Sequence, residues 1–134
     1  MKQSAQIRDM LVQFYDGFSR NDAAALLDLI SSKEGVLTIG TDPQEWWDER
    51  DKLRRAFEAQ MKELGGAGLV AGEPQGYEEG SVGWASDRPT IRMADGTEIP
   101  ARVTAVVHRE GDAWKLVQTH ISLGVANEET VGQT

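Results

Sequence analysis

The sequence predicts an α+β domain, because helix patterns fill its first half and strand patterns fill its second half. Apolar residues recur at helical spacing as far as Leu64, and alternating β-branched segments follow Gly66. The dipeptides Asp95-Gly96 and Gly111-Asp112 favour tight hairpin turns. We therefore expect three N-terminal helices and a curved, mostly antiparallel sheet that wraps around the longest helix as a cone-shaped barrel with an interior.

The first two helices have recognisable ends. Residues 4–20 form an amphipathic segment, and polar residues at 19–22 mark a break after it. Either Asn21 or Asp22 can cap the second helix, and Gly35 ends that unit. The inward positions are Ile7, Met10, Leu11, Phe14 and Phe18 in the first helix and Leu26, Leu27 and Ile30 in the second.

A third helix is predicted over residues 42–64, where several start signals coincide. Asp42 is a suitable N-cap, Pro43 suits the first helical position, and Glu45 completes a capping box with Asp42. Gly65-Gly66 ends the helix. Arg50 lies on or beside the apolar stripe of this helix. The stripe consists of Trp46, Leu53, Phe57, Met61 and Leu64.

Five strands are expected, over residues 36–39, 69–77, 81–93, 97–109 and 113–122. Pro89 implies an edge or a bulge in the third of them, because proline cannot donate to a strand ladder. Residues 1–123 thus form a single domain, and the polar residues 124–134 form a flexible C-terminal tail.

The composition excludes several classes of function. The 134 residues include 22 acidic and 14 basic ones, and the net charge of −8 argues against nucleic acid or a membrane as main partner. Cysteine is absent, which excludes disulfides, thiolate nucleophiles and cysteine-ligated metals. Two histidines without helical pairing predict no metal site, and no motif predicts a cofactor. The first residues lack an unbroken apolar core, so we expect no signal peptide and a cytoplasmic location.

Four segments carry a family resemblance: IGTDPQEWW (39–47), GSVGWAS (80–86), DGTEIPARVTAVVHR (95–109) and GDAWKLVQTHIS (111–122). Together with the order of helices and strands, they resemble the nuclear transport factor two-like superfamily and, within it, the SnoaL-like branch, over about residues 6–122. The resemblance implies the cone-shaped α+β fold. It implies no single activity, because this fold hosts isomerases, dehydratases, cyclases, binding modules and assembly domains.

The resemblance also suggests catalytic positions. Steroid-isomerase members carry a general-base Asp in an Asp-Pro motif, which Asp42-Pro43 resembles, and a tyrosine on the first helix, near the position of Tyr15. Their oxyanion hole includes a second acid, for which the sequence offers no convincing counterpart. Glu49 stands before Arg50 where the related pattern has glycine.

Asp42 has two interpretations. As a base, it would be a carboxylate beside indole rings at the mouth of a pocket, able to take a carbon-bound proton. The N-cap interpretation accounts for Asp42, Pro43 and Glu45 together, and it is favoured. Trp46 and Trp47 would be about 100° apart on a helix, so one, expected to be Trp46, belongs to the core and the other to a pocket or a dimer surface.

Arg102 and His120 are the polar groups best suited to act on a ligand. A two-residue turn at Gly111-Asp112 places them on different faces of the hairpin, whereas a three-residue loop pairs them on one face beside Thr104 and Gln118. The second register would form a polar patch able to hold a carboxylate or enolate. The Gly-Asp dipeptide favours the first, and a lone strand histidine is more often structural than catalytic.

The favoured function is the binding of an apolar or aromatic small molecule in the cone interior. Trp84 is a candidate wall, because its small neighbours Gly83 and Ala85 leave space beside its ring, although the ring could equally fill that space. The predicted ligand-binding residues are Tyr15, Trp46, Trp47, Phe57, Trp84, Arg102 and His120.

Two other functions stay open. One is a cofactor-free isomerase, dehydratase or cyclase that uses Asp42 or His120 as general base. The other is a homodimeric assembly module with a filled interior. Independently of the function, both faces of the last two strands carry apolar residues, so we expect a homodimer through the outer sheet face.

Overall fold

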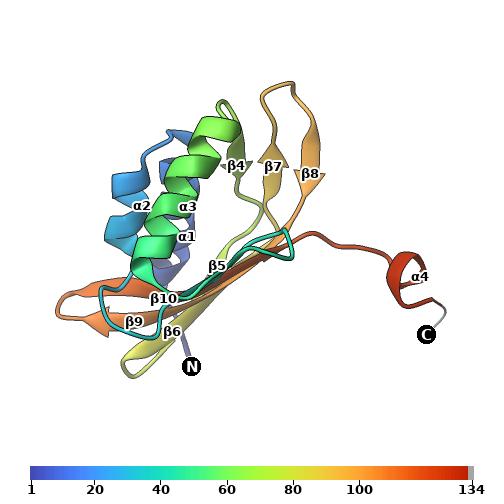
Figure 1. Ribbon diagram of the computed structural model, residues 1–134. Coiled ribbons are helices and arrows are strands. Elements are labelled where there is room, and N and C mark those ends of the chain that lie inside the picture. Colours follow the sequence, from blue (N-terminus) through green and yellow to red (C-terminus); the bar gives the residue numbers. More distant parts are fainter. Residues whose placement is uncertain (133–134) are drawn as a thin grey trace.

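Three helices lie against one face of a curved sheet in the computed structural model, which describes residues 1–132 (Figure 1). The helices are α1 (Ala5–Ser19), α2 (Ala23–Leu29) and α3 (Arg50–Glu63), and a short α4 (Asn127–Thr130) follows near the C-terminus. The α+β class and the three N-terminal helices are confirmed. Ser4 caps α1 by accepting a hydrogen bond from the Ile7 amide at 3.1 Å, and Asp22 caps α2 through the Ala25 amide at 3.0 Å.

The strands form two sheets. The larger has the order β1-β5-β6-β9-β10-β2-β3, and the smaller has the order β4-β7-β8. All pairs are antiparallel except β10 with β2. The curved, mostly antiparallel sheet is confirmed, but it is open and does not close into the expected cone-shaped barrel. The strands are β1 (Lys2–Gln3), β2 (Leu37–Ile39), β3 (Trp46–Trp47), β4 (Gly68–Val70), β5 (Gln75–Glu79), β6 (Val82–Asp87), β7 (Thr90–Arg92), β8 (Glu98–Pro100), β9 (Arg102–Glu110) and β10 (Ala113–Ser122).

The small sheet exists because three of the expected strands break in the middle. Segments 69–77, 81–93 and 97–109 each contribute one strand to the small sheet and one to the large sheet. The breaks lie at residues 71–74, at Arg88-Pro89 and at Ala101, and the Ala101 amide donates to the Pro89 carbonyl at 2.9 Å. Pro89 has no N–H to offer to the ladder, which explains why β6 ends just before it.

Helix α1 packs closely onto β5 and β6 because two inward positions are glycines. A Cβ at Gly83 would overlap the Ile7 side chain, and a Cβ at Gly76 would overlap the backbone of Arg8. Ile7 is fully buried in the core between helix and sheet. Small residues on this face of the strands therefore set the depth at which the helix lies.

The predicted start of the third helix is wrong. Asp42 and Glu45 form bonds like those of a capping box: the Asp42 amide donates to the Glu45 carboxylate at 2.9 Å, and the Asp42 carboxylate accepts at 3.0 Å from the Gln44 amide, one residue earlier than in the standard box. These bonds close a single turn, and the next residues, Trp46 and Trp47, pair with β2 as strand β3. Helix α3 begins only at Arg50.

The residue before Arg50 explains how the chain enters α3 without a glycine. Glu49 is the N-cap and has a φ of −136°, an extended conformation that any residue can adopt. Arg50 itself donates to the Ile30 carbonyl at 2.7 Å and so fixes the start of α3 to the end of α2.

The segment after β10 leaves the body of the domain and ends in α4, whose residues are exposed (Figure 1). It corresponds to the predicted tail of residues 124–134, of which residues 133–134 lie outside the described part. None of the helices within residues 1–132 is long and apolar enough to span a membrane.

Candidate functional site

An apolar cavity of about 160 Å³ lies between helices α1 and α3 and the inner faces of both sheets. Its size matches cavities that hold a single aromatic ring and is smaller than the roughly 300 Å³ at which ordinary ligand pockets begin. The lining residues are Phe14, Phe18, Thr38, Gly40, Thr41, Glu45, Trp47, Phe57, Gln60, Leu64, Ala67, Leu69, Ile91, Val103, Thr119 and Ile121.

Aromatic side chains form much of the cavity wall. The rings of Phe14 on α1 and Phe57 on α3 meet edge to face, with centroids 6.2 Å apart. Trp47 faces the cavity from β3, whereas Trp46 is 59% exposed on the opposite side of the same strand. The expectation that Trp46 belongs to the core is therefore wrong. Neighbouring residues of a strand point to opposite faces, so Trp47 lies at the cavity, one of the two places expected for it, and Trp46 points to solvent.

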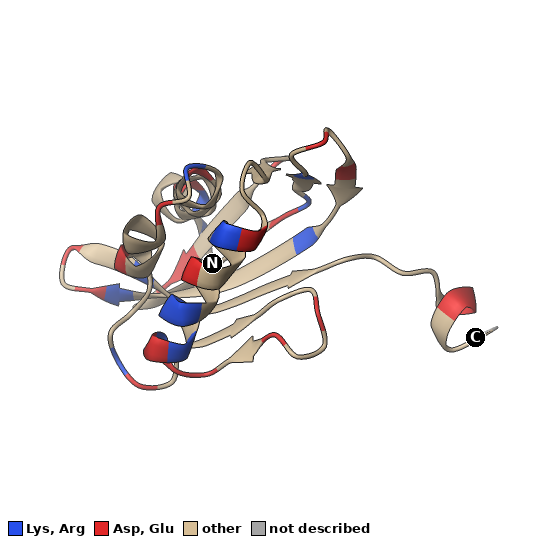
Figure 2. Ribbon diagram, turned by 45° about the horizontal axis from the view of Figure 1, so that its top comes forward, with Lys and Arg blue, Asp and Glu red and all other residues tan. Residues whose placement is uncertain are grey.

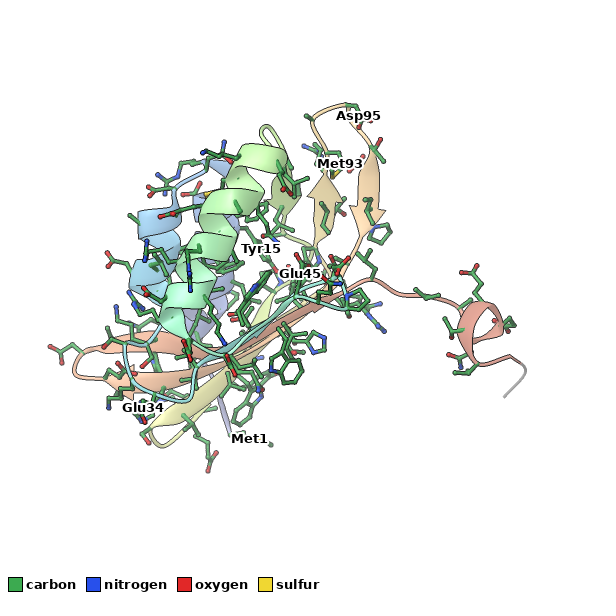
Figure 3. The ribbon with its side chains drawn as sticks, viewed as in Figure 1. Met1, Tyr15, Glu34, Glu45, Met93 and Asp95 are labelled. Carbon is green, nitrogen blue, oxygen red and sulfur yellow. The ribbon has the colours of Figure 1, made fainter. Side chains whose placement is uncertain are left out.

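Glu45 and Gln60 bring polar atoms to the cavity edge, and the sequence interpretation did not assign either to the site. The Gln60 amide on α3 donates to the Glu45 carboxylate at 2.6 Å, while the other oxygen of that carboxylate accepts from the Asp42 amide. Glu45 lies on the loop after β2, beside the helices (Figure 3). The capping-box pattern identified Glu45 as structural, but its second bond, to a residue 15 positions away, has no sequence signal.

Arg102 and His120 lie on the outer face of the large sheet, away from the cavity. Gly111-Asp112 does form the two-residue turn, but a β-bulge between Leu116 and Gln118 then shifts the register by one residue. Arg102 consequently pairs with Ser122, and His120 pairs with Thr104. The side chains share one face, as the alternative register required, but this face is exposed, so the expectation that they add polarity to the cone interior is corrected.

Three of the predicted residues meet around a shallow depression on the outer side of the domain. Asp42, Trp46 and His120 border it together with Leu123 and Val125 from the segment after β10. Asp42 is exposed and its carboxylate caps the Gln44 amide. Neither Asp42 nor His120 lines the apolar cavity, so neither can act as a base on a molecule bound there.

Trp84 also faces outward. It lies on β6 and its ring stacks on Tyr77 of β5, with centroids 6.4 Å apart. Its small neighbours Gly83 and Ala85 point to the other face and are buried there. The space that they leave is filled by α1 rather than by the indole or by a ligand, so Trp84 is not a wall of the cavity.

Tyr15 is buried and does not line the cavity. Its hydroxyl donates to the Asp87 carboxylate at 2.9 Å, and burial, together with this hydrogen bond, raises the pKa of Tyr15 above its usual value. Asp87 also accepts from the amides of Gly72, Glu73 and Arg88 at 3.1, 2.9 and 2.8 Å. The structure thus supplies an acid beside the first-helix tyrosine. However, four donors already satisfy this carboxylate, so the pair is a structural clamp.

The remaining ionisable side chains suggest no metal centre. Within residues 1–132, no group of three or more His, Asp or Glu side chains is placed to hold an ion. Charged residues lie mostly on the helices and in the connections between elements (Figure 2). His108 is near the tip of the β9–β10 hairpin, where its Nδ1 lies 3.5 Å from the Glu110 carboxylate.

Comparison with solved structures places the fold among NTF2-like and cystatin-like proteins. An NTF2-like protein of unknown function from Pseudomonas putida has a TM-score of 0.82 at 12% identity, covering 97% of this chain and 91% of its own. A protein from Streptomyces avermitilis, provisionally named a dehydratase of the NTF2-like family, has a TM-score of 0.79 at 19% identity, covering 90% and 95%. A cystatin-like protein of unknown function from Nostoc punctiforme has a TM-score of 0.78 at 15% identity, covering 94% and 97%.

At these identities the similarity shows the fold and not an activity. No curated protein matches the sequence. A family model does match, over residues 7–126, and its description is the SnoaL-like domain. The match covers most of the chain and includes the cavity, so this protein belongs to the SnoaL-like domain family.

Proposed function

We propose that this domain binds a small apolar or aromatic molecule in the cavity between α1, α3 and the inner sheet face. The observation that carries the proposal is an open space of about 160 Å³ with an aromatic wall of Phe14, Trp47 and Phe57. An apolar cavity of this size in an otherwise close-packed interior forgoes packing energy that a ligand could restore.

An enzymatic function has less support. A cofactor-free isomerase, dehydratase or cyclase would need an acid or base at the cavity, and Asp42 and His120 lie outside it. Glu45 is the carboxylate that borders the cavity, and both of its oxygens already accept hydrogen bonds, from Asp42 and Gln60. Binding without turnover is the simpler proposal.

Binding can be tested with toluene by NMR, using ¹³C-labelled methyl groups as reporters. Toluene has seven non-hydrogen atoms, and at about 0.7 kcal/mol for each the dissociation constant would be about 0.2 mM. We expect shifts at Leu69, Val103 and Ile121, which line the cavity.

Two variants at adjacent positions of β10 provide the control. Ile121→Phe places a ring in the cavity and should abolish binding, whereas His120→Phe places the same ring on the outer face and should leave binding unchanged. Thermal unfolding verifies that both variants fold. Absence of toluene shifts in the wild type, or equal binding by the two variants, would contradict the proposal.

We also propose that two copies pair through the outer face of the large sheet. Val82 and Val106 are 43% and 38% exposed there, on neighbouring strands, beside the stacked rings of Tyr77 and Trp84. An apolar surface on the central strands of a sheet is typical of a contact between subunits.

Light scattering at micromolar concentration should give about twice the 14.7 kDa mass of one chain. Val106→Asp should shift the mass to that of a monomer, because the carboxylate would lose water at the interface. Val12→Asp, at an exposed position of α1, is the matched control and should remain dimeric. A monomeric wild type would rule the dimer out.

A further inference from the structure

Two threonines stand side by side on the cavity face of the large sheet. Thr38 of β2 and Thr119 of β10 are register partners in the parallel pair of strands, and both line the cavity. They are 8% and 5% exposed, among mostly apolar lining residues. A valine would fill either position with the same shape, so a hydroxyl here is the feature that needs a reason.

Neither hydroxyl has a hydrogen-bond partner within residues 1–132. Glu45, the charged group at the cavity edge, is paired with Gln60, and the buried Tyr15 is paired with Asp87. Both hydroxyls border the cavity space, and a ligand that offered them no polar atom would exclude water and leave them without a bond, which is unfavourable. A ligand atom that bonds to Thr38 and Thr119 would remove this cost.

The charge around the cavity limits the ligand further. Among the described residues that line it there is no Lys, Arg or His, and Glu45 is the ionisable group at its edge. An anionic ligand would lose its hydration, gain no positive partner and face a carboxylate. The volume of about 160 Å³ restricts the ligand to about one ring.

We infer that the cavity selects a neutral one-ring molecule bearing a hydroxyl or carbonyl oxygen, which Thr38 and Thr119 hold by hydrogen bonds while the ring lies against Phe14, Trp47 and Phe57. The inference rests on the proposed binding function and adds to it the chemical class of the ligand and the two residues that determine it.

The test compares toluene, phenol and benzoate by NMR titration of the wild type and of the double variant Thr38→Val/Thr119→Val. Phenol should lose about 5- to 10-fold in affinity in the double variant, because the hydrogen bonds disappear while the shape is retained. Toluene affinity should stay unchanged or rise. Thr104→Val, at an exposed threonine on the outer face of β9, is the matched control and should change neither affinity.

Benzoate should show no binding to the wild type at concentrations that saturate phenol. An unchanged phenol-to-toluene ratio in the double variant, toluene binding without phenol binding in the wild type, or benzoate binding equal to that of phenol would overturn the inference while leaving the binding function intact. Failure of the wild type to bind toluene or phenol would instead remove the binding function, and the inference with it.

Discussion

The two faces of strands β9 and β10 have different environments, although successive residues of each strand point alternately to one face and to the other. Val103, Thr119 and Ile121 line the cavity, while Thr104 and His120 are exposed on the outer face. On the inner face, buried side chains pack with residues of the helices in the hydrophobic core. On the outer face, they contact neighbouring strands and solvent.

The difference between the two faces depends on one extra residue in β10. Trp114 and Leu116 are buried, so strict alternation would also bury Gln118 and His120. The bulge between Leu116 and Gln118 exchanges the faces, and Thr119 is buried instead. Because of this single extra residue, a threonine faces the cavity where strict alternation would place a histidine.

The largest effect is expected from deletion of Thr119, which lies directly after the bulge in β10. Every later residue of β10 would change faces, so His120 would turn toward the core and Ile121 toward solvent, at a cost of about 5 kcal/mol or more, because a polar group would be buried without a partner and an apolar group would leave the core. We expect loss of the cooperative thermal transition. Deletion of Val117 is the control, because it removes the extra residue of the bulge and leaves Ile121 on the inner face, so the transition should remain. Equal behaviour of the two deletions would contradict these face assignments.

A smaller loss is expected when the inner-face clamp is broken by Asp87→Ala. The three amide donors and the Tyr15 hydroxyl would all lose their acceptor, which should lower the free energy of unfolding by about 3–5 kcal/mol. Tyr15→Phe removes one of the four bonds and should cost about 1 kcal/mol. Urea unfolding measures the free energy of unfolding of both variants. If Asp87→Ala cost no more than Tyr15→Phe, the three amide donors would have found other partners.

Adjacent residues of β6 test the two faces directly. Gly83→Ala places a methyl group against Ile7 and should cost about 2–3 kcal/mol, because the core is already filled. Trp84→Ala removes a far larger group from the outer face and should cost only about 1 kcal/mol, since mainly the stacking on Tyr77 is lost. The reverse order in urea unfolding would contradict this description of the faces.

The smallest effect concerns a carboxylate at the hairpin end. The Ser31 hydroxyl, 2.6 Å away, lowers the pKa of Glu110 below its usual value of 4.5. A lowered pKa in the folded state stabilises the protein above pH 4.5, and the contribution is lost as the pH falls through and below that value. Glu110→Gln should therefore cost about 0.5–1 kcal/mol at pH 7 and almost nothing at pH 3.

Urea unfolding at the two pH values measures this difference. Glu34→Gln, at an exposed position in the same region, should show no such dependence on pH. A Glu110→Gln cost that is the same at pH 7 and pH 3 would mean that the Ser31 bond does not depend on the charge of Glu110.

Features that depend on near neighbours in the chain could be predicted from the residues alone. Ser4 and Asp22 cap the first two helices, and Asp42 and Glu45 form bonds like those of a capping box. The two-residue turn at Gly111-Asp112 forms as well. Each of these involves residues no more than four positions apart, so the side chains alone specify them. The order of helix and strand patterns predicted the α+β class, and the family resemblance implied the particular fold.

Features that join residues distant in the sequence depend on the tertiary structure. Whether a capping box opens a helix or a single turn depends on what the next residues pair with, and Trp46–Trp47 pairs with β2. Tyr15 and Asp87 are 72 positions apart, and Glu45 and Gln60 are 15 apart. The bulge in β10 is likewise set by the strands on either side. The polar residues of the cavity follow from these long-range pairings, and no local pattern specifies them.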